Sequence, residues 1–489
     1  MRTTDAIGGV TEYAYDGSGN PIVIEDAKNN RIIARYDALG RKAWVDDPNQ
    51  GKTEFTYNDF GELEREKDAN GDNIYYDMDL LGRVTSRSGD NGAAASFLWD
   101  TEKEGLLTKQ SITGHSTEYT YDSAARVTTS TVTIDGDMYV TETAYDTNYG
   151  RPTLMTYPKL GSATEALKIE YRYNSNGYLT HERNASSKHV YREITAQDAF
   201  GNITGADINA GGITGEYTYH GATGQMLSTK VEASPTDIVQ YIHYSQYDSY
   251  GNLTLQENRS NYKVGTTNDS YQYDKLHRLT QSTITVNGAS DTIYYGYDAV
   301  GNMLKKSDHS ANSTDAYQYS SGSNKLASIL LKSAETDVFT YDNKGNQTLI
   351  KRGAETVSSV TYNVFNKPTT IEKNGANINL SYGADLMRYK QVRGGEGEAV
   401  TTFYIGKLVE VEQRASGNTY KSYISDIAIL TEKDGQGAEI AFTHRDRLGS
   451  ATSMTDENDK LISTRHFDPF VSPVIAAGIN WSPLAYPHS

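Results

Sequence analysis

The sequence predicts an all-β protein, a long ribbon of antiparallel β-hairpins that coils into a spiral, hollow shell. Three observations support this prediction. A Tyr-Asp-x-x-Gly motif recurs along most of the 489 residues. The residues around each motif alternate with period two, and no stretch keeps the 3.6-residue apolar period of an amphipathic helix. Tyrosine is unusually common, with 38 residues against 10 Phe and 3 Trp.

Each motif begins with an anchor residue, usually tyrosine, that is followed by Asp or Asn and then by glycine. The first five anchors, Tyr15, Tyr36, Tyr57, Met78 and Trp99, are 21 residues apart, and 17 anchors can be counted up to Tyr382. Such a fixed period indicates a repeat architecture. The copies that we take as structural anchors are Tyr15-Asp16 with Gly19, Tyr36-Asp37 with Gly40, Tyr247-Asp248 with Gly251, Tyr297-Asp298 with Gly301, and Tyr341-Asp342 with Gly345.

Each repeat is predicted to form one β-hairpin. Pairs such as Tyr119 and Tyr121 place two rings on one face of a strand. Asp suits the first position of a type I turn, and the following glycine supplies the left-handed conformation that closes the loop with a bulge. A second alternating run follows, for example residues 253–255. Two strands for each anchor give about 34 strands.

So long a ribbon must curl or wind up, because β-sheets twist. The apolar fraction is 37% and the net charge is −17, which argues against a dry β-sandwich. We therefore predict a sheet that is wet on both faces. Tyrosine rings stack between neighbouring hairpins in this prediction, and their hydroxyl groups reach water. A wet lumen inside the coil is a further inference.

Composition excludes several classes of protein. The absence of cysteine excludes disulfide scaffolds, thiolate nucleophiles and Cys-ligated zinc. No apolar run reaches the ~20 residues of a membrane-spanning helix, and the first nine residues contain no apolar segment of a Sec-type signal peptide. An acidic chain is a poor partner for nucleic acid. We expect no cofactor, no metal site and no nucleic-acid partner.

Beyond residue 390 the pattern changes. The segments that stand out are Tyr404-Ile405-Gly406, then His444-Arg445-Asp446-Arg447-Leu448-Gly449, and then Phe467-Asp468-Pro469-Phe470. The repeats over residues 10–390 resemble the YD repeat of the Rhs family, and these later segments look like the Rhs-associated core. We therefore divide the chain into a hairpin shell, residues 1–390, and an incomplete core-like region, residues 391–489.

The resemblance implies a spiral β-ribbon shell that encloses a toxic C-terminal domain. Relatives include polymorphic interbacterial toxins, shell components of insecticidal Tc toxins, and teneurins. The core closes one end of the shell in the bacterial members, and a downstream aspartyl self-cleavage site frees the payload. This sequence departs from the pattern at Val471, where the family has glycine, and it ends before the cleavage motif and the toxin domain. It is either a fragment of a longer protein or a shell module that works with another chain.

Three functional hypotheses follow. The first is a non-catalytic shell of a bacterial Rhs-type toxin system that encapsulates or presents a toxin payload, in cis or in trans. Such a protein would be made in the bacterial cytoplasm and exported by a specialised secretion apparatus. The second is a cell-surface adhesion module that binds carbohydrate, which a glycan array would detect. The third is a hydrolase that uses Asp446, Asp456 or Asp468.

Two motifs have a structural interpretation as well as a catalytic one. His444-Arg445-Asp446 resembles the start of a kinase catalytic loop, but Arg447 and Ala451 stand where that loop requires Leu and Asn. A turn motif of the family is favoured. The aspartates of the repeats are expected to form turns, because their carboxylates bond the backbone of the loop.

Overall fold

The computed structural model describes residues 1–259, 266–286, 288–395, 397–467 and 469–470. In these residues it contains 42 β-strands and one short 3₁₀ turn, Asn209–Gly211. Strands that pair are antiparallel and consecutive in the chain, as in β2 with β3 and β40 with β41. The predicted all-β hairpin ribbon is confirmed. The 17 anchors account for β2–β35, the 34 strands that were predicted, and the remainder are β1 and β36–β42.

The strands of the first part of the ribbon are β1 Arg2–Thr4, β2 Val10–Tyr15, β3 Pro21–Glu25, β4 Arg31–Tyr36, β5 Lys42–Asp47, β6 Gly51–Tyr57, β7 Leu63–Lys67, β8 Asn73–Met78, β9 Val84–Gly89, β10 Ala94–Trp99, β11 Leu107–Ile112, β12 His115–Tyr121, β13 Val127–Ile134, β14 Asp137–Tyr145, β15 Pro152–Thr156, β16 Lys168–Tyr173, β17 Leu179–Asn184, β18 Val190–Gln197, β19 Ile203–Ile208, β20 Ile213–Tyr219, β21 Met226–Ser234, β22 Asp237–Tyr247, β23 Leu253–Asn258, β24 Thr267–Tyr273, β25 Leu279–Val286 and β26 Ala289–Tyr297. The later strands are β27 Met303–Lys306, β28 Tyr317–Tyr319, β29 Leu326–Leu330, β30 Thr336–Tyr341, β31 Gln347–Arg352, β32 Glu355–Tyr362, β33 Pro368–Lys373, β34 Ala376–Tyr382, β35 Arg388–Gly394, β36 Val400–Ile405, β37 Val409–Gln413, β38 Thr419–Ile424, β39 Ala428–Lys433, β40 Glu439–Arg445, β41 Ala451–Thr455 and β42 Leu461–Thr464.

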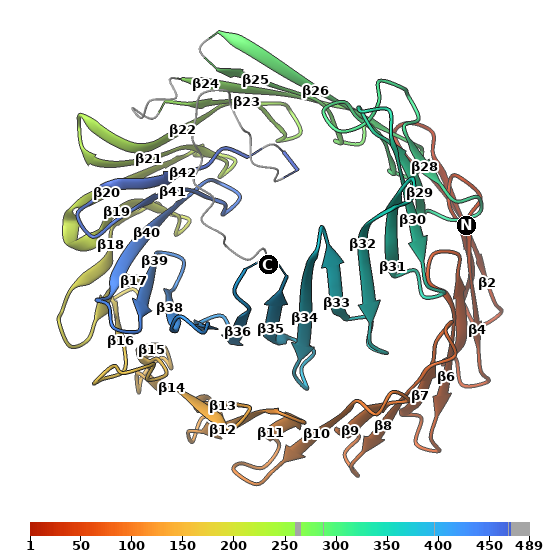
Figure 1. Cartoon of the computed structure of the whole chain (residues 1–489), viewed down its shortest axis with the longest axis horizontal. Helices are drawn as coiled ribbons and strands as arrows, with labels where there is room; N and C mark the ends of the chain where they lie inside the picture. Colours follow the sequence, from red (N-terminus) through yellow and green to blue (C-terminus); the bar gives the residue numbers. More distant parts are fainter. Residues whose placement is uncertain (260–265, 287, 396, 468, 471–489) are drawn as a thin grey trace.

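The ribbon winds into a spiral of more than one turn (Figure 1). Strands β1–β26 form a ring, which we call the first turn. From Asp298 onward the chain, which we call the second turn, passes beside the N-terminal strands and continues inside the ring to β42. Lys28 Nζ lies 2.8 Å from Asp298 Oδ2, which marks where the second turn begins to pack on the first. The sheet is coiled and is not closed into a barrel.

The hairpin turn of each repeat, here called the YD turn, is held by its aspartate. In the turn of Asp248, the backbone N–H groups of Tyr250 and Asn252 both donate to Asp248 Oδ1 over 2.9 Å. Gly251 N–H donates to Asp248 O, and Gly251 has a φ of 88°. The turns of Asp16, Asp37, Asp298 and Asp342 have the same bonds, and Gly19, Gly40, Gly301 and Gly345 have φ values of 88°, 77°, 94° and 81°.

In most repeats the side chain of the anchor residue ties the hairpin to the hairpin before it. Tyr57 Oη donates to Lys42 O over 2.8 Å, and Tyr273 Oη donates to Leu253 O over 2.8 Å. Where Trp99 replaces tyrosine, its indole N–H donates to Val84 O. The same hydroxyl bond is made by Tyr36, Tyr121, Tyr145, Tyr173, Tyr247, Tyr319, Tyr341, Tyr362 and Tyr382. The prediction gave these hydroxyls no role beyond contact with water; in the structure each donates to a backbone carbonyl of the preceding hairpin.

Replacing Tyr273 by phenylalanine is expected to lower the free energy of unfolding by about 1–2 kcal/mol, because a carbonyl of the buried Leu253 loses its donor. The matched control is Tyr250→Phe, since 78% of Tyr250 is exposed and its hydroxyl can bond water. Urea unfolding followed by circular dichroism measures both changes. Equal losses in the two variants would show that the hydroxyl bond contributes nothing.

The residue after the turn glycine makes a second tie. Arg41 Nε donates to Asp37 Oδ2 over 2.7 Å, and the Arg41 guanidinium lies 4.5 Å from the ring centre of Tyr57 in the next hairpin. The backbone N–H and guanidinium of Arg41 hold the pKa of Asp37 below its ordinary value. The same stacking joins Arg83 to Trp99, Arg126 to Tyr145, Arg151 to Tyr173, Arg278 to Tyr297 and Arg388 to Tyr404. Stacked guanidinium groups therefore bridge adjacent repeats.

The largest buried apolar cluster lies between the two turns of the spiral. The first turn contributes residues such as Tyr157 and Ile213, and the second contributes Ile424 and Phe442. Tyr157 Oη also donates to Tyr423 O across this contact.

The domain boundary that the sequence predicts between residues 390 and 391 falls inside strand β35. The division into two domains stays a prediction. No helix in the described part of the chain has the length and apolar character that a membrane crossing needs.

Candidate functional site

The predicted core-motif residues occupy two separate places. Tyr404 and Gly406 stand at the end of β36 and in the tight turn to β37, where Gly406 has a φ of 58°. Tyr404 stacks against Arg388, with 4.3 Å between the guanidinium and the ring centre. His444 lies on β40, and the turn to β41 contains Asp446, Leu448 and Gly449. Pro469 is exposed, and Asp468 lies outside the described residues.

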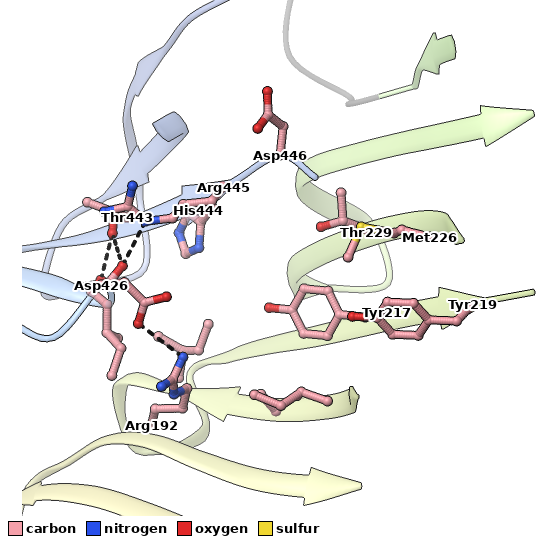
Figure 2. A pocket seen from close by; sticks show the side chains of 14 residues that line it. Arg192, Tyr217, Tyr219, Met226, Thr229, Asp426, Thr443, His444, Arg445 and Asp446 are labelled. Atoms are coloured by element: carbon pink, nitrogen blue, oxygen red, sulfur yellow. Dashed lines mark hydrogen bonds and ion pairs between the residues drawn. The ribbon is translucent and has the colours of Figure 1, made fainter. Parts of the chain in front are cut away.

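A pocket of about 190 Å³ lies beside the second group, where β40 and the turn between β38 and β39 face β18–β21 of the first turn (Figure 2). The first turn lines it with aromatic, apolar and polar side chains, and the second turn lines it mainly with polar ones. The residues labelled in Figure 2 are Arg192, Tyr217, Tyr219, Met226, Thr229, Asp426, Thr443, His444, Arg445 and Asp446. This pocket is the strongest candidate site for chemistry, because it contains His444 and Asp446.

His444 is a buried, neutral histidine. Only 2% of its surface is exposed, and burial lowers its pKa to about 4. Its Nε2 lies 3.0 Å from Thr455 Oγ1, and Nδ1 has no hydrogen-bond partner among the described residues. A general base works best when its pKa is near the working pH and a carboxylate orients it. His444 is paired with a hydroxyl instead, so it fits a packed core better than a catalytic pair.

The charges beside the pocket are neutralised in an ion-pair network. Arg192 Nη2 lies 2.7 Å from Glu182 Oε2, and Arg192 Nη1 lies 3.3 Å from Asp426 Oδ1. Glu182 is 2% exposed, and its other carboxylate oxygen accepts a hydrogen bond from Ser425 Oγ. The network connects β17 and β18 to the turn between β38 and β39. Its role is therefore to join the two turns of the spiral.

The acids proposed for hydrolysis are turn formers. Asp446 Oδ1 accepts hydrogen bonds from the N–H groups of Leu448 and Ser450, both at 2.9 Å. Asp456 Oδ1 accepts equivalent bonds in the next turn. The two carboxylates follow β40 and β41, so they lie at opposite ends of β41. Paired-acid hydrolysis needs two carboxyl groups that flank one bond, and this arrangement does not provide them.

The substitution Asp446→Asn is expected to change the free energy of unfolding by less than about 0.5 kcal/mol, because an amide oxygen can accept both backbone hydrogen bonds. Asp446→Ala removes the acceptor and is expected to cost about 1–2 kcal/mol. Thermal unfolding of the two variants distinguishes them. If Asp446 were a hydrolytic acid, both variants would be inactive, and the activity assay would not separate them.

Two first-turn residues that sequence reasoning missed hold the core motif in place. Gln240 on β22 donates to Arg445 O over 2.9 Å and accepts a hydrogen bond from Ser453 Oγ. Tyr244 Oη accepts a hydrogen bond from Arg447 N–H over 2.8 Å. The period-two alternation that ends at Tyr247 does not reach Tyr244, which lies three residues before it, and nothing in the sequence marks Gln240. In the described residues no group of three or more His, Asp and Glu side chains could hold a metal ion.

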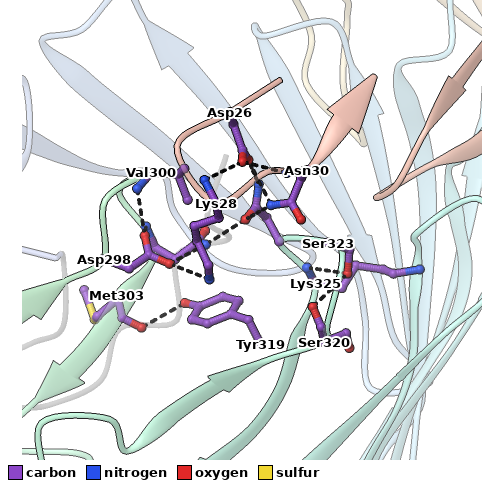
Figure 3. A network of polar contacts seen from close by, with 12 residues as sticks. Asp26, Lys28, Asn30, Asp298, Val300, Met303, Tyr319, Ser320, Ser323 and Lys325 are labelled. Atoms are coloured by element: carbon purple, nitrogen blue, oxygen red, sulfur yellow. Dashed lines mark hydrogen bonds and ion pairs between the residues drawn. The ribbon is translucent and has the colours of Figure 1, made fainter. Parts of the chain in front are cut away.

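The two circuits of the spiral, its first and second turn, meet along a contact that we call the seam. Two kinds of hairpin loop form the seam. The YD turns of the second circuit contact the linker turns of the first circuit, which are the loops that connect one repeat to the next. In Figure 3 the linker turn Asp26–Asn30 contacts the YD turns at Asp298 and Ser320–Lys325. Asn30 Nδ2 donates to Asn324 Oδ1, and Asn324 Nδ2 donates to Asp26 Oδ2, both over 3.1 Å. Complementary donor and acceptor side chains therefore join the first and second turns of the spiral.

Further along the seam, a buried ion pair replaces these amides. Lys344 is 8% exposed, and its Nζ lies 2.5 Å from Asp68 Oδ2. The ammonium group also donates to Val364 O over 2.8 Å. A cavity of about 260 Å³ adjoins the pair and is lined in part by Glu66 and Arg87. Burial raises the pKa of Glu66. A lysine in a YD turn thus contributes a buried contact to the seam.

Several solved structures of Tc toxins are similar to this fold. The crystal structure of TcdB2-TccC3-TEV matches with a TM-score of 0.80 and 15% identity, over 96% of this chain and 27% of that chain. TcdB2-TccC3 matches with a TM-score of 0.79 at 15% identity, over 96% and 28%. The Photorhabdus luminescens Tc holotoxin pore matches with a TM-score of 0.80 at 16% identity, over 96% and 26%. No protein-family model and no curated protein matches the sequence. The likeness supports an Rhs-like shell fold for a chain that spans about a quarter of the length of these toxins.

Proposed function

We propose that the chain is a non-catalytic wall segment of a shell in a bacterial Rhs-type toxin system, which encapsulates or presents a toxin payload. The observation that carries the proposal is the spiral course of the ribbon, since 96% of the chain matches TcdB2-TccC3 with a TM-score of 0.80. The payload is supplied downstream in the same polypeptide or by a partner. The shell is made in the bacterial cytoplasm and leaves through a specialised secretion apparatus.

The chemistry of the wall supports a container. Repeats are tied to their neighbours by tyrosine hydroxyl bonds such as that of Tyr273, and the two layers are joined by buried polar pairs such as Asp68 with Lys344. The first kind of contact holds neighbouring hairpins together, and the second holds the two layers together. The candidate catalytic groups support the same role, because the side chain of Asp446 accepts bonds from its own turn and His444 is buried and neutral.

In this proposal the chain forms only part of the shell, and additional β-ribbon completes it. The chain corresponds to about a quarter of the length of the Tc toxin chains that it matches. The partners that complete the shell would be other toxin components, and the delivery apparatus would recognise the assembled complex. Repeat architectures can be extended in this way, because a further hairpin pairs with the last strand of the ribbon.

A protease-access experiment tests the proposal. A flexible peptide with a specific protease site is attached after Ser489, and the same peptide is attached before Met1 in a second version. The container role predicts at least about a tenfold slower cleavage at the C-terminal site, because local opening limits access of the protease. Lys344→Ala weakens the seam and should bring the two rates closer together. Equal rates both in the chain alone and in the chain assembled with the components that complete the wall would contradict encapsulation.

A further inference from the structure

A row of large apolar side chains follows the free edge of the first turn. Each stands immediately before the glycine of a YD turn, and between 74% and 86% of each residue is exposed. This row, here called the apolar rim, consists of Leu39, Phe60, Leu81, Tyr149, Phe200 and Tyr250. Single exposed apolar residues are ordinary, but a repeated row of them marks an interaction site.

The second turn shows what happens to the same position when another ribbon covers it. Lys344, immediately before Gly345, is 8% exposed, and Val300, before Gly301, is half-buried. Phe365 is also half-buried, and the guanidinium of Arg87 lies 4.7 Å from its ring centre. The linker turns of the first turn cover these residues at the seam. Leu448, at the same position before Gly449, is 73% exposed, so the second turn is covered at this position only where it lies on a linker turn. The apolar rim consists of positions of the same kind that this chain leaves uncovered.

The rim has enough area for a stable interface. A large aromatic side chain can bury ~150–250 Å², so six exposed side chains offer on the order of 1,000 Å², against ~800 Å² per partner in an interface of standard size. The chain as a whole has a net charge of −17, and this charge is offset at only part of the rim, because the carboxylates of Asp198 and Asp248 bond asparagine side chains. The rim arginines Arg41, Arg83 and Arg126 are ion-paired with the aspartates of their own turns.

We infer that the apolar rim binds the apolar rim of a second copy of this chain, in a dimer with twofold symmetry. The first turn comprises 26 strands, whereas the second turn comprises 16, so the free edge of the second turn is too short to cover the rim. The first turn of another copy has the same length and curvature. A surface that meets its own copy generates a closed C2 dimer, the commonest oligomer of soluble proteins.

The inference does not depend on the proposed function, because the rim would bind its copy whatever the shell contains. It adds one consequence to that function. Two rings that meet edge to edge form a deeper wall than either chain alone, and each closes one open face of the other.

Sedimentation velocity of the full chain from about 1 to about 100 µM tests the inference. The expected species has twice the 54.0 kDa mass of the chain. The triple variant Leu39→Ser, Phe60→Ser, Leu81→Ser should raise the dimer dissociation constant by ~100-fold or more. The pair Phe200→Ser, Tyr250→Ser, on another part of the rim, should weaken the dimer in the same direction. Melting temperatures confirm that these variants remain folded.

The matched control removes exposed apolar side chains from the strands instead of the rim. Met138→Ser with Val338→Ser, at 66% and 47% exposed residues of β14 and β30, should leave the dissociation constant unchanged. A monomer at every concentration would overturn the inference, as would a dimer that survives both rim variants. Chemical cross-linking that produces a ladder beyond the dimer would also overturn it, since a head-to-tail contact continues indefinitely.

Discussion

The variant Lys344→Ala is expected to lower the free energy of unfolding by about 3–5 kcal/mol at pH 7. The substitution leaves the carboxylate of Asp68 at the seam without the ammonium group that lies 2.5 Å away. It also removes the hydrogen bond to Val364 O. An uncompensated buried charge is costly because the protein interior solvates it poorly. Guanidinium unfolding, followed by the signal of the three tryptophans and by circular dichroism, measures the loss.

Two further variants show whether the buried charge causes the effect. The double variant Asp68→Asn, Lys344→Met removes both charges and keeps an oxygen that can accept the turn hydrogen bonds of Asp68, so it should cost less than Lys344→Ala alone. Lys52→Ala breaks an ion pair with Glu54 whose side chains are 47% and 45% exposed, and it should cost under about 1 kcal/mol. If Lys344→Ala cost no more than Lys52→Ala, the seam would not depend on this pair.

Acidification from pH 7 to pH 4 is expected to destabilise the fold through His444. The pKa of His444 is about 4 in the folded protein and 6.5 in an ordinary environment, so the unfolded chain binds this proton more readily. Stability contributed by neutral His444 is complete above pH 6.5 and is lost as the pH falls toward 4. A difference of this size corresponds to about 3 kcal/mol.

Comparison with His444→Gln isolates this contribution. Glutamine does not titrate, so the difference in unfolding free energy between wild type and variant should change by about 3 kcal/mol between pH 7 and pH 4. Other groups cancel in that difference. One of them acts in the opposite sense: burial alone would lower the pKa of His466, but its pairing with Asp269, 3.0 Å away, raises it. Parallel pH profiles of the two proteins would show that His444 is protonated without cost.

The hairpins could be predicted because the interactions that form them are local. The turn of Asp248 needs only Tyr250, Gly251 and Asn252, all within four residues. The hydroxyl ties were missed although the sequence contains their signal, since 38 tyrosines against 10 phenylalanines indicate that the oxygen is needed. The stacking of the arginine after the turn on the anchor ring of the next repeat could also have been predicted, because both recur with the period of the repeat.

The seam could not be predicted, because its partners are set by how far the ribbon travels in one turn of the spiral. Asn70 and Asp342, which are hydrogen-bonded, are 272 residues apart, and no local pattern relates them. The pocket at His444 has the same origin. The sequence marked His444 and Asp446 as part of a core motif, but Arg192 and Gln240 come from the other layer.

The direction of the tyrosine ties has a consequence for biosynthesis. Tyr57 bonds the carbonyl of Lys42, and Tyr273 bonds that of Leu253, so a hairpin with this tie binds to chain that has already left the ribosome. Every new repeat therefore finds its template complete when it emerges, and the wall can grow in step with translation. The seam closes later, once the ribosome has added the residues of a full circuit. We expect nascent chains stalled before Asp298 to form an ordered ribbon whose linker turns are not yet covered by the second turn.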